Sequence, residues 1–342
     1  MKNYIYILIL VFSFSSVIIG FFYAKKLKSF FYYSAFLPTI VASWFRGNAG
    51  TDTENYRFYF DTYDYQNFSF FSIESFFWAI PFFTKILGGD FIIFSIIHSF
   101  LCYFLAVKGA INLDKKMPIV GLAILPVFLI DATFNGLRYG LAFSIFIFIF
   151  QYTFNSNKLS NKFILLSPTM VHSSSLLFFL SSLPYHLFFK RFFLFLLIAI
   201  FFVIFLHNID ISYFIYKLES YSQTQKPNIL SGLSLIINSI LYFSIYLLGN
   251  ENKNHKIQFY ICYLLFFISF LISSFTYAGL RFMQIFSLII PLIVSNSINN
   301  KNYTLKFCIL LFISIFNILN FLRQIYFVGV DGGVLFLPYG IL

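Results

Sequence analysis

The sequence predicts an all-α fold, a polytopic integral membrane helix bundle of about 10 to 12 transmembrane helices with re-entrant or interfacial segments. Of the 342 residues, 60% are hydrophobic and 10% are charged, and the mean hydropathy is +0.84. A soluble domain of this length has about a quarter of its residues charged. The apolar residues gather in runs that approach the roughly 20 residues needed to cross a bilayer. Basic residues collect in short loops between these runs, as they do on the cytoplasmic side of membrane proteins.

Ten apolar runs are predicted to cross the membrane within a single transmembrane domain over residues 1–342. The first run resembles a signal peptide, but Lys25, Lys26 and Lys28 follow it without a small-residue cleavage site, so we expect a retained span. Longer polar loops, at about 46–89 and 208–231, are expected outside. The ten runs are residues 4–23, 29–45, 90–107, 117–131, 141–154, 192–207, 232–248, 257–276, 281–296 and 303–322.

Two further apolar stretches are too interrupted to be simple spans. Residues 72–88 contain Glu74, and residues 163–184 contain Pro168, His172 and a run of serines. We expect the first stretch at the outer surface and the second to enter the membrane and return. This topology places the lysine-rich loops on the inner side, as the distribution of positive charge in membrane proteins requires.

Under this topology the basic residues separate into two groups. Lysines dominate the inner loops, where they orient the chain, so the net charge of +11 does not imply nucleic acid. Arginine is different because its planar fork of donors suits phosphate or carboxylate. Five of the six arginines fall on the outer side or near outer span ends, namely Arg46, Arg57, Arg138, Arg281 and Arg323.

Residues 46–57, directly after the second apolar run, form the first polar block that could carry chemistry. Arg46 and Arg57 supply forked cations, and Asp52 supplies a carboxylate. Tyr56 is the first of several tyrosines at a spacing typical of an aromatic interfacial belt. The alternative is an ordinary charged loop with a tyrosine anchor.

Three further candidates lie at or within predicted spans. Arg138 follows Asn135 at the start of a span, where a charge is costly and usually faces a partner or a watery cavity. His172 lies in a broken segment and can change protonation near neutral pH. Arg281, at an outer span end, could join Arg138 around an anion. The alternatives are a snorkelling arginine, a histidine bonded to neighbouring helices and an interfacial anchor.

Several chemistries find no support in the sequence. Cys102, Cys262 and Cys308 lie far apart in apolar stretches, without metal-ligand spacing or a disulfide framework. The sequence has no Walker A loop, so ATP is not the direct driver. It also has no GxSxG elbow and no HExxH helix. We therefore expect no cofactor and no metal.

Short motifs follow one another along nearly the whole chain. They are Arg46-Gly47, Gly50-Thr51-Asp52 and Tyr56; Glu74 before Phe76-Phe77; Asn135-Gly136-Leu137-Arg138 with Ala142; His172-Ser173; Leu280-Arg281; and Pro338-Tyr339. In this order they resemble the EpsG family of bacterial exopolysaccharide proteins, a group that includes Wzy-type O-antigen polymerases. Tyr139 departs from the family pattern, which often has Gln after the arginine, and so removes an amide from the presumed site.

The resemblance implies a glycosyltransferase-type polysaccharide polymerase that uses polyprenyl-pyrophosphate-linked donors. Such an enzyme joins undecaprenyl-pyrophosphate-linked oligosaccharide repeat units into O-antigen or capsular or exopolysaccharide. It would act at the periplasmic face of the bacterial inner (cytoplasmic) membrane. The expected partners are the lipid-linked oligosaccharide, membrane lipid, and chain-length regulator and flippase proteins, with no nucleic acid.

For this reaction we expect Arg138 and Arg281 to bind the pyrophosphate, because forked cations stabilise the charge that develops on a leaving diphosphate. The acceptor hydroxyl needs a base, for which Asp52 is favoured and His172 is the alternative. The other residues expected to contact substrate are Arg46 and Arg57, which would position glycan or phosphate, and Asn135 and Tyr56.

Two other functions use the same arginines. A flippase or transporter of lipid-linked sugars would hold the pyrophosphate during movement. Such a protein should have paired broken helices in two repeated halves, a symmetry that this sequence does not show. Another polyprenyl-donor glycosyltransferase or a ligase would have similar donor chemistry and site polarity.

Overall fold

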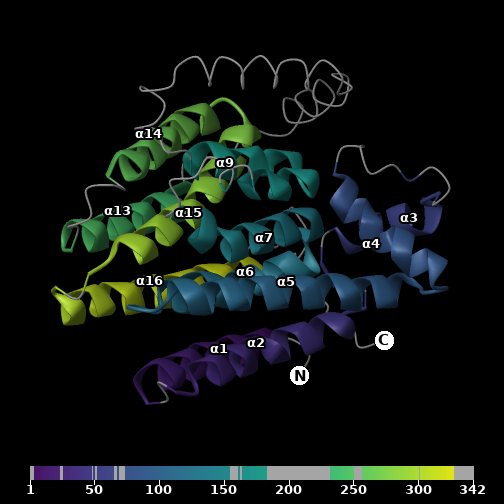
Figure 1. Ribbon diagram of the computed structural model, residues 1–342, viewed down its shortest axis with the longest axis horizontal. Coiled ribbons are helices and arrows are strands. Elements are labelled where there is room, and N and C mark those ends of the chain that lie inside the picture. The colour runs from purple at the N-terminus through teal and green to yellow at the C-terminus, as the bar shows by residue number, and fades with distance from the viewer. Residues whose placement is uncertain are drawn as a thin grey trace. The chain divides into compact units, whose positions relative to one another are not determined.

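The fold was analysed in a computed structural model. It describes residues 4–23, 26–47, 49–50, 52–64, 68, 74–154, 161, 164–182, 232–249, 256–299 and 301–326. Every regular element within these ranges is helical, which confirms the predicted all-α class (Figure 1). The predicted run at 192–207, the predicted loop at 208–231 and the Pro338-Tyr339 motif lie outside the described residues.

The helices follow the predicted apolar runs closely. In chain order they are α1 (Ile5–Phe22), α2 (Lys28–Trp44), α3 (Thr53–Thr62), α4 (Ser75–Ile86), α5 (Phe91–Leu113), the π-helical η2 (Val120–Ile124), α6 (Leu125–Phe134), α7 (Leu137–Phe154), the 3₁₀ segments η3 (Ile164–Met170) and η4 (Ser173–Ser175), α9 (Leu176–Ser182), α13 (Leu233–Leu247), α14 (Lys256–Ser273), α15 (Tyr277–Ser297) and α16 (Tyr303–Tyr326).

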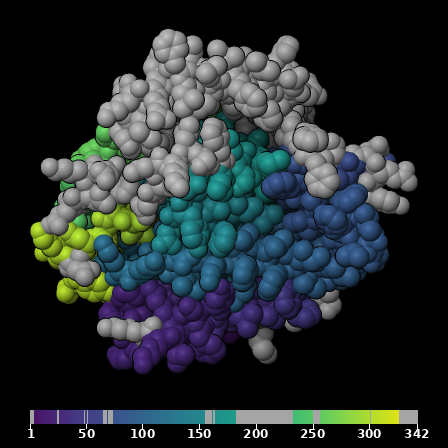
Figure 2. All heavy atoms as spheres, in the orientation of Figure 1, coloured from purple at the N-terminus to yellow at the C-terminus, as the bar shows by residue number. Residues whose placement is uncertain are grey.

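Among the described residues, six helices are long and apolar enough to cross a membrane. They are α1, α5, α7, α14, α15 and α16, so the chain is a multi-pass membrane protein. Figure 2 shows the N-terminal helices at the surface of the molecule. Helix α1 has exposed apolar side chains, including Leu8 and Val11. Lipid is the natural solvent for such a surface. The total of about 10 to 12 spans stays a prediction.

The two interrupted stretches form short pieces. Helix α4 has 12 residues and contains Pro81; at 1.5 Å per residue it is about 18 Å long, shorter than the roughly 30 Å of hydrocarbon. The stretch around Pro168 is divided into η3, η4 and α9. Both observations agree with stretches that do not cross as single helices. Their positions relative to the membrane stay predictions.

The chain divides into two compact units, residues 1–176 with 298–342, and residues 177–297. In the first unit α2 packs against α1 and α5, α5 packs against α7, and α16 packs against η2 (Figure 1). In the second unit α15 packs against α13 and α14. The assignment of residues 1–342 to one transmembrane domain stays a prediction.

In the first unit, the C-terminal end of α5 carries a buried acid on the side where lysines gather. The Asp114 carboxylate accepts hydrogen bonds from the backbone N–H groups of Val120 (3.0 Å) and Gly121 (2.7 Å) and from the Tyr32 hydroxyl (3.1 Å). Lys28 donates to the Asp114 carbonyl. These contacts tie the start of α2 and the π-helical turn to the end of α5.

The opposite end of α5 carries arginine. Arg57 lies over the ring of Phe91, the first residue of α5, with 5.3 Å from Cζ to the ring centroid. The 23 residues of α5 extend about 34 Å at 1.5 Å per residue, close to the thickness of a hydrocarbon core. Lys28 and Arg57 therefore lie at opposite ends of a helix long enough to cross the membrane.

Candidate functional site

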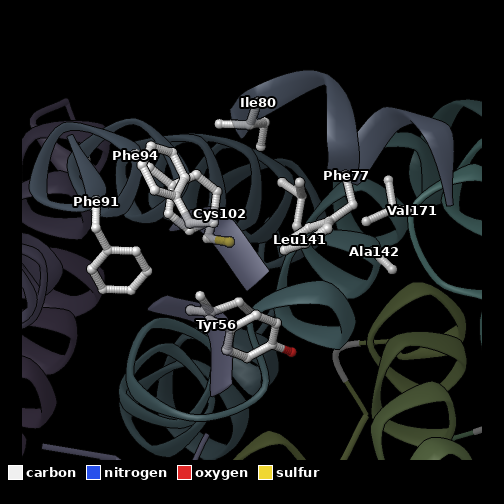
Figure 3. Packing of buried hydrophobic residues seen from close by; sticks show 11 residues of the cluster. Tyr56, Phe77, Ile80, Phe91, Phe94, Cys102, Leu141, Ala142 and Val171 are labelled. Carbon is white, nitrogen blue, oxygen red and sulfur yellow. The ribbon is translucent and has the colours of Figure 1, made fainter. Parts of the chain in front are cut away.

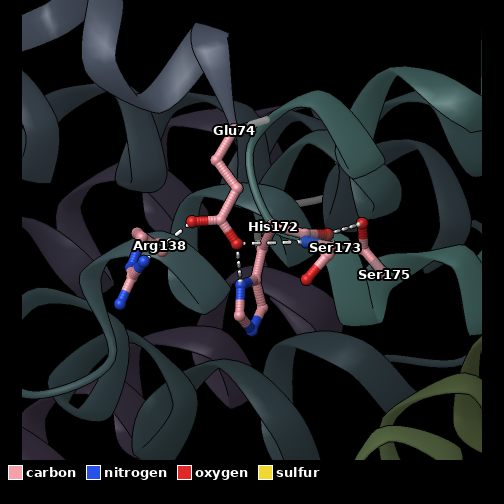
Figure 4. Close-up of polar contacts among 5 residues, drawn as sticks. All are labelled: Glu74, Arg138, His172, Ser173 and Ser175. Atoms are coloured by element: carbon pink, nitrogen blue, oxygen red, sulfur yellow. Dashed lines mark hydrogen bonds and ion pairs between the residues drawn. The ribbon is translucent and has the colours of Figure 1, made fainter. Parts of the chain in front are cut away.

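A carboxylate that binds both an arginine and a histidine forms the centre of the candidate site. Glu74 Oε2 lies 2.7 Å from Nη1 of Arg138, and Glu74 Oε1 lies 2.9 Å from Nδ1 of His172. The backbone N–H of Ser173 also donates to Oε1, at 3.3 Å. Figure 4 shows the carboxylate between the two side chains. These residues are brought together from α4, α7 and the turn before η4.

Glu74 is held in an unusual and buried position. Its side chain is 3% exposed, whereas those of Arg138 and His172 are 28% and 19% exposed. Its backbone has φ 60° and ψ 28°, the left-handed region that side-chain-bearing residues rarely adopt. Such a conformation costs on the order of 1–3 kcal/mol and persists where surrounding contacts impose it. The ion pair and the hydrogen bonds to the carboxylate are contacts of that kind.

An apolar cluster positions the site residues. Three buried residues of one cluster are close in sequence to the site residues. Phe77 is one turn after Glu74, Leu137 directly precedes Arg138, and Val171 directly precedes His172. Figure 3 shows this cluster. A well-packed core fixes the directions of the polar side chains that leave it. The complete buried set is Tyr56, Phe60, Phe77, Ile80, Phe91, Phe94, Cys102, Leu137, Leu141, Ala142 and Val171.

The start of α7 has a second support. Nε2 of the fully buried His98 lies 2.9 Å from the Leu137 carbonyl and donates to it, because a carbonyl oxygen only accepts. His98 therefore holds the residue that precedes Arg138.

The contact with Glu74 sets the chemistry of the His172 ring. An ionised carboxylate only accepts hydrogen bonds, so Nδ1 of His172 carries the proton in this contact. In the neutral imidazole, Nε2 is then the nitrogen that can take a proton. A carboxylate in this position also stabilises the imidazolium that forms. The ring of Tyr139 packs edge-on against His172, with centroids 6.3 Å apart.

The aromatic ring of Tyr56 packs against Arg138. The Arg138 guanidinium lies over the Tyr56 ring, with 5.9 Å from Cζ to the centroid. Burial raises the pKa of Tyr56, while the positive charge of Arg138 acts in the opposite direction. Tyr56 stays protonated and neutral near pH 7, so the formal charges at the centre come from Glu74, Arg138 and, when protonated, His172.

Arg46 and Arg57 lie together in the same unit, where the end of α2 meets α3 and α5. Arg46 is 3% exposed, and its Nη1 donates to the Thr133 carbonyl near the end of α6. Burial and, to a smaller extent, the charge of Arg57 lower the pKa of Arg46 to about 10, so it stays protonated near neutral pH. Gly47, with φ 60°, makes the turn that follows Arg46.

Asp52 and Asn135 occupy helix ends. Asp52 is the residue before α3, and its charge contributes to raising the pKa of Tyr56. Asn135 follows α6, is 9% exposed and donates from Nδ2 to Asp131 Oδ1 at 3.0 Å. Their predicted roles as base and substrate contact stay predictions.

Arg281 belongs to the second unit. It is an exposed residue in the second turn of α15, where its Cζ lies 5.3 Å from the Tyr277 ring centroid and its Nη1 donates to Gln284 Oε1 at 3.4 Å. The expectation that Arg281 and Arg138 hold one anion between them stays a prediction. The Arg138–His172 relationship, in contrast, lies entirely within the first unit.

The sequence does not single out Glu74 as a site residue, although Glu74 joins Arg138 to His172. A signal was present, because Glu74 is part of the motifs that carried the family resemblance. The described residues contain no cluster of three or more His, Cys, Asp or Glu side chains placed to hold a metal ion.

The comparisons with known proteins give one match. The EpsG family matches residues 29–340, which include both ends of α5, α4, the start of α7 and the segment around His172. No curated protein and no solved structure matches the chain. Because the match extends over nearly the whole chain, it covers every candidate residue described above. The protein therefore belongs to the EpsG family and is a membrane protein linked to exopolysaccharide synthesis.

Proposed function

We propose that this protein is a polymerase that joins undecaprenyl-pyrophosphate-linked oligosaccharide repeat units. The observation that carries the proposal is the Glu74–His172 contact beside Arg138. It combines an oriented proton acceptor with a forked cation in a partly exposed position between apolar helices. A sugar acceptor hydroxyl and a lipid-linked diphosphate need those two groups.

The proposed reaction proceeds as follows. Nε2 of His172 takes the proton of an acceptor sugar hydroxyl, and the hydroxyl oxygen attacks the anomeric carbon of the donor glycan. The bond between that carbon and the pyrophosphate oxygen breaks, and undecaprenyl pyrophosphate leaves with the electron pair. Arg138 stabilises the developing negative charge. Glu74 stabilises the imidazolium, as a carboxylate does in other histidine-based catalytic pairs.

The charge distribution supports a location at the outer face of the inner membrane. Lys28 and Arg57 lie at opposite ends of α5. The Glu74 centre is on the Arg57 side, because Tyr56, which contacts Arg138, directly precedes Arg57. Since lysine-rich ends face the cytoplasm, the Glu74 centre would face the periplasm. There it would meet repeat units already moved across the membrane. Flippase and chain-length regulator proteins are therefore the partners that we propose.

An in vitro reaction tests the function. The purified protein is mixed with a synthetic lipid-linked repeat unit, and the products are separated by length. We expect a ladder of polymers that stay linked to the lipid. Arg138→Ala should give no long products while the protein remains inserted, whereas Arg323→Ala, a change of the same kind at an exposed position, should retain the ladder. A complete ladder from Arg138→Ala would remove Arg138 from the site.

The same reaction separates the alternatives. A flippase has no chemistry to perform in detergent and would leave the repeat unit unchanged. A ligase would transfer one unit to a different acceptor without extending it. A single-addition glycosyltransferase would stop after one step. Only a polymerase lengthens the product stepwise from one kind of lipid-linked unit.

A further inference from the structure

A second cationic position lies in the first unit, apart from the Glu74 centre. A small hollow there is lined by Arg46, Arg57 of α3, Ser95 of α5 and Trp44 of α2. Within the described part of the chain, two of these lining residues have a buried polar atom without a hydrogen-bond partner, Nη2 of Arg46 and Oγ of Ser95. Both atoms can donate a hydrogen bond, so an acceptor placed in the hollow could satisfy them.

Arg46 makes its contacts through part of its guanidinium group only. Nη1 donates to the Thr133 carbonyl, and the Phe134 ring lies 5.7 Å from Cζ. Buried polar groups in native proteins nearly always have partners, and a charged nitrogen without one is costly. The Thr133 contact explains why Arg46 is held at the end of α6. It does not provide a hydrogen-bond partner for the second terminal nitrogen, Nη2.

Within the described ranges, neither of these two arginines forms an ion pair. Among the described residues, no carboxylate lies within 4.0 Å of a guanidinium nitrogen of Arg46 or Arg57, whereas Arg138 has Glu74 at 2.7 Å. Arg57 lies over the Phe91 ring, with 5.3 Å from Cζ to the ring centroid. Two like charges at one hollow repel each other, and an anion between them would remove that cost.

We propose that this hollow is an anion site that takes the phosphate oxygens of the diphosphate on a lipid-linked substrate. Forked guanidinium donors with a nearby hydroxyl suit phosphate oxygens. The hollow is small, so the lipid and the glycan would remain outside it. The identity of the ligand rests on the proposed function, but the existence of an anion site does not.

Helix α3 connects this anion site to the Glu74 centre. Tyr56 lies beneath Arg138, and the next residue, Arg57, lines the hollow. Two successive residues of α3 thus contact the two cationic positions. The protein would have two separate cationic positions, one paired with Glu74 for the reaction and one for anchoring the substrate.

Binding of inorganic pyrophosphate and of undecaprenyl pyrophosphate tests the inference. The full chain is placed in nanodiscs of zwitterionic lipid, and affinity is measured by calorimetry and by the shift in unfolding temperature. We expect both compounds to bind the wild type. Arg57→Gln should weaken binding by about tenfold or more, as loss of one charge-assisted contact does, and Ser95→Ala should weaken it less. Arg323→Gln, with the same charge change, should bind as the wild type does.

Other results would overturn the anion site or its assignment to the substrate. Equal affinity of Arg57→Gln and wild type, or equal weakening in Arg323→Gln, would overturn the site. Strong weakening by Arg138→Gln with none from Arg57→Gln would place the anion at the Glu74 centre instead. Nanodiscs that contain phosphatidylglycerol distinguish a lipid headgroup from the substrate as the source of the bound phosphate. If that lipid displaces pyrophosphate, the hollow holds a lipid headgroup and the substrate assignment fails.

The binding and polymerisation assays together distinguish failure of the proposed function from failure of the anion site. If Arg57-dependent binding is observed but no polymer ladder ever forms, the anion site stands and the polymerase assignment falls. If the ladder forms in Arg57→Gln with unchanged dependence on substrate concentration, the polymerase stands and the anchoring role falls. Arg57→Lys gives a further check, because a point charge without a planar fork should restore binding only in part.

Discussion

Nδ1 of His172 donates a hydrogen bond of 2.9 Å to Oε1 of Glu74, a residue 98 positions earlier in the chain. The other carboxylate oxygen is bound to Arg138. One buried acid thus orients an imidazole and neutralises a guanidinium at the same time. Loss of the Glu74 carboxylate would therefore affect His172 and Arg138 together.

Replacement of Glu74 by Gln should reduce the rate of the proposed polymerisation about 100-fold or more. A general base contributes about 100- to 10,000-fold, and in the proposed mechanism the Glu74 carboxylate orients the base, His172. Rates are measured from the length ladder with purified, folded protein. Glu54→Gln is the matched control, since Glu54 is exposed in the first turn of α3. A Glu74→Gln protein with the wild-type rate would exclude the carboxylate from the mechanism.

Replacement of His172 by Gln tests the base itself. The Gln amide can still donate to Glu74, but it cannot take a proton from an acceptor hydroxyl. We expect the rate to fall about 100-fold or more, and the remaining rate to lose the decrease that the wild type should show in acid. The pH–rate profile is the measurement. If Asp52→Asn removes the acid decrease and His172→Gln keeps it, then Asp52 is the base.

The sequence was sufficient to locate the helices and to select two of the three residues that meet at the Glu74 centre. Hydrophobic length and periodicity are local properties, so the apolar runs correctly located α1, α5, α14 and α16. Arg138 and His172 could be selected because ionisable residues within apolar segments are costly and usually functional.

The role of Glu74 could not be predicted in the same way. Its partners are 64 and 98 residues away, and their meeting depends on how α4, α7 and the turn before η4 pack around one apolar cluster. The sequence grouped Arg138 with Arg281 because both were expected near outer span ends, and their joint binding of one anion stays a prediction. The unpaired nitrogen of Arg46 is a property of tertiary packing and has no local sequence signal.

Gly50 should not tolerate a side chain. Its φ is +106°, and a Cβ atom would meet the Phe134 carbonyl oxygen and lie 2.9 Å from Thr53 Oγ1. We expect Gly50→Ala to lower the free energy of unfolding by at least about 2 kcal/mol, from backbone strain and the clash together. Thermal unfolding in detergent measures the loss. Gly136→Ala is the control, because its Cβ would have only an ordinary contact with Tyr139, at 3.8 Å. Equal stability of the two variants would show that the turn before α3 can rearrange.

Asp114 should make stability depend on pH. Burial raises its pKa from 3.8 to about 6, although Lys28 acts in the opposite direction. The folded state therefore holds this proton more strongly than the unfolded state does. The resulting stabilisation is complete below about pH 4, decreases as the pH rises through about 6, and is absent above about 7.

Comparison of the wild type with Asp114→Asn isolates this contribution, because other titrating groups are shared and cancel in the difference. We expect the unfolding temperature of the wild type, relative to the variant, to fall between pH 4 and pH 7. The corresponding change in free energy is on the order of 2–3 kcal/mol, since one pKa unit is equivalent to about 1.4 kcal/mol. A difference that grows with pH would mean that Lys28 and the two N–H donors hold Asp114 ionised, and that the ion pair outweighs burial at this end of α5.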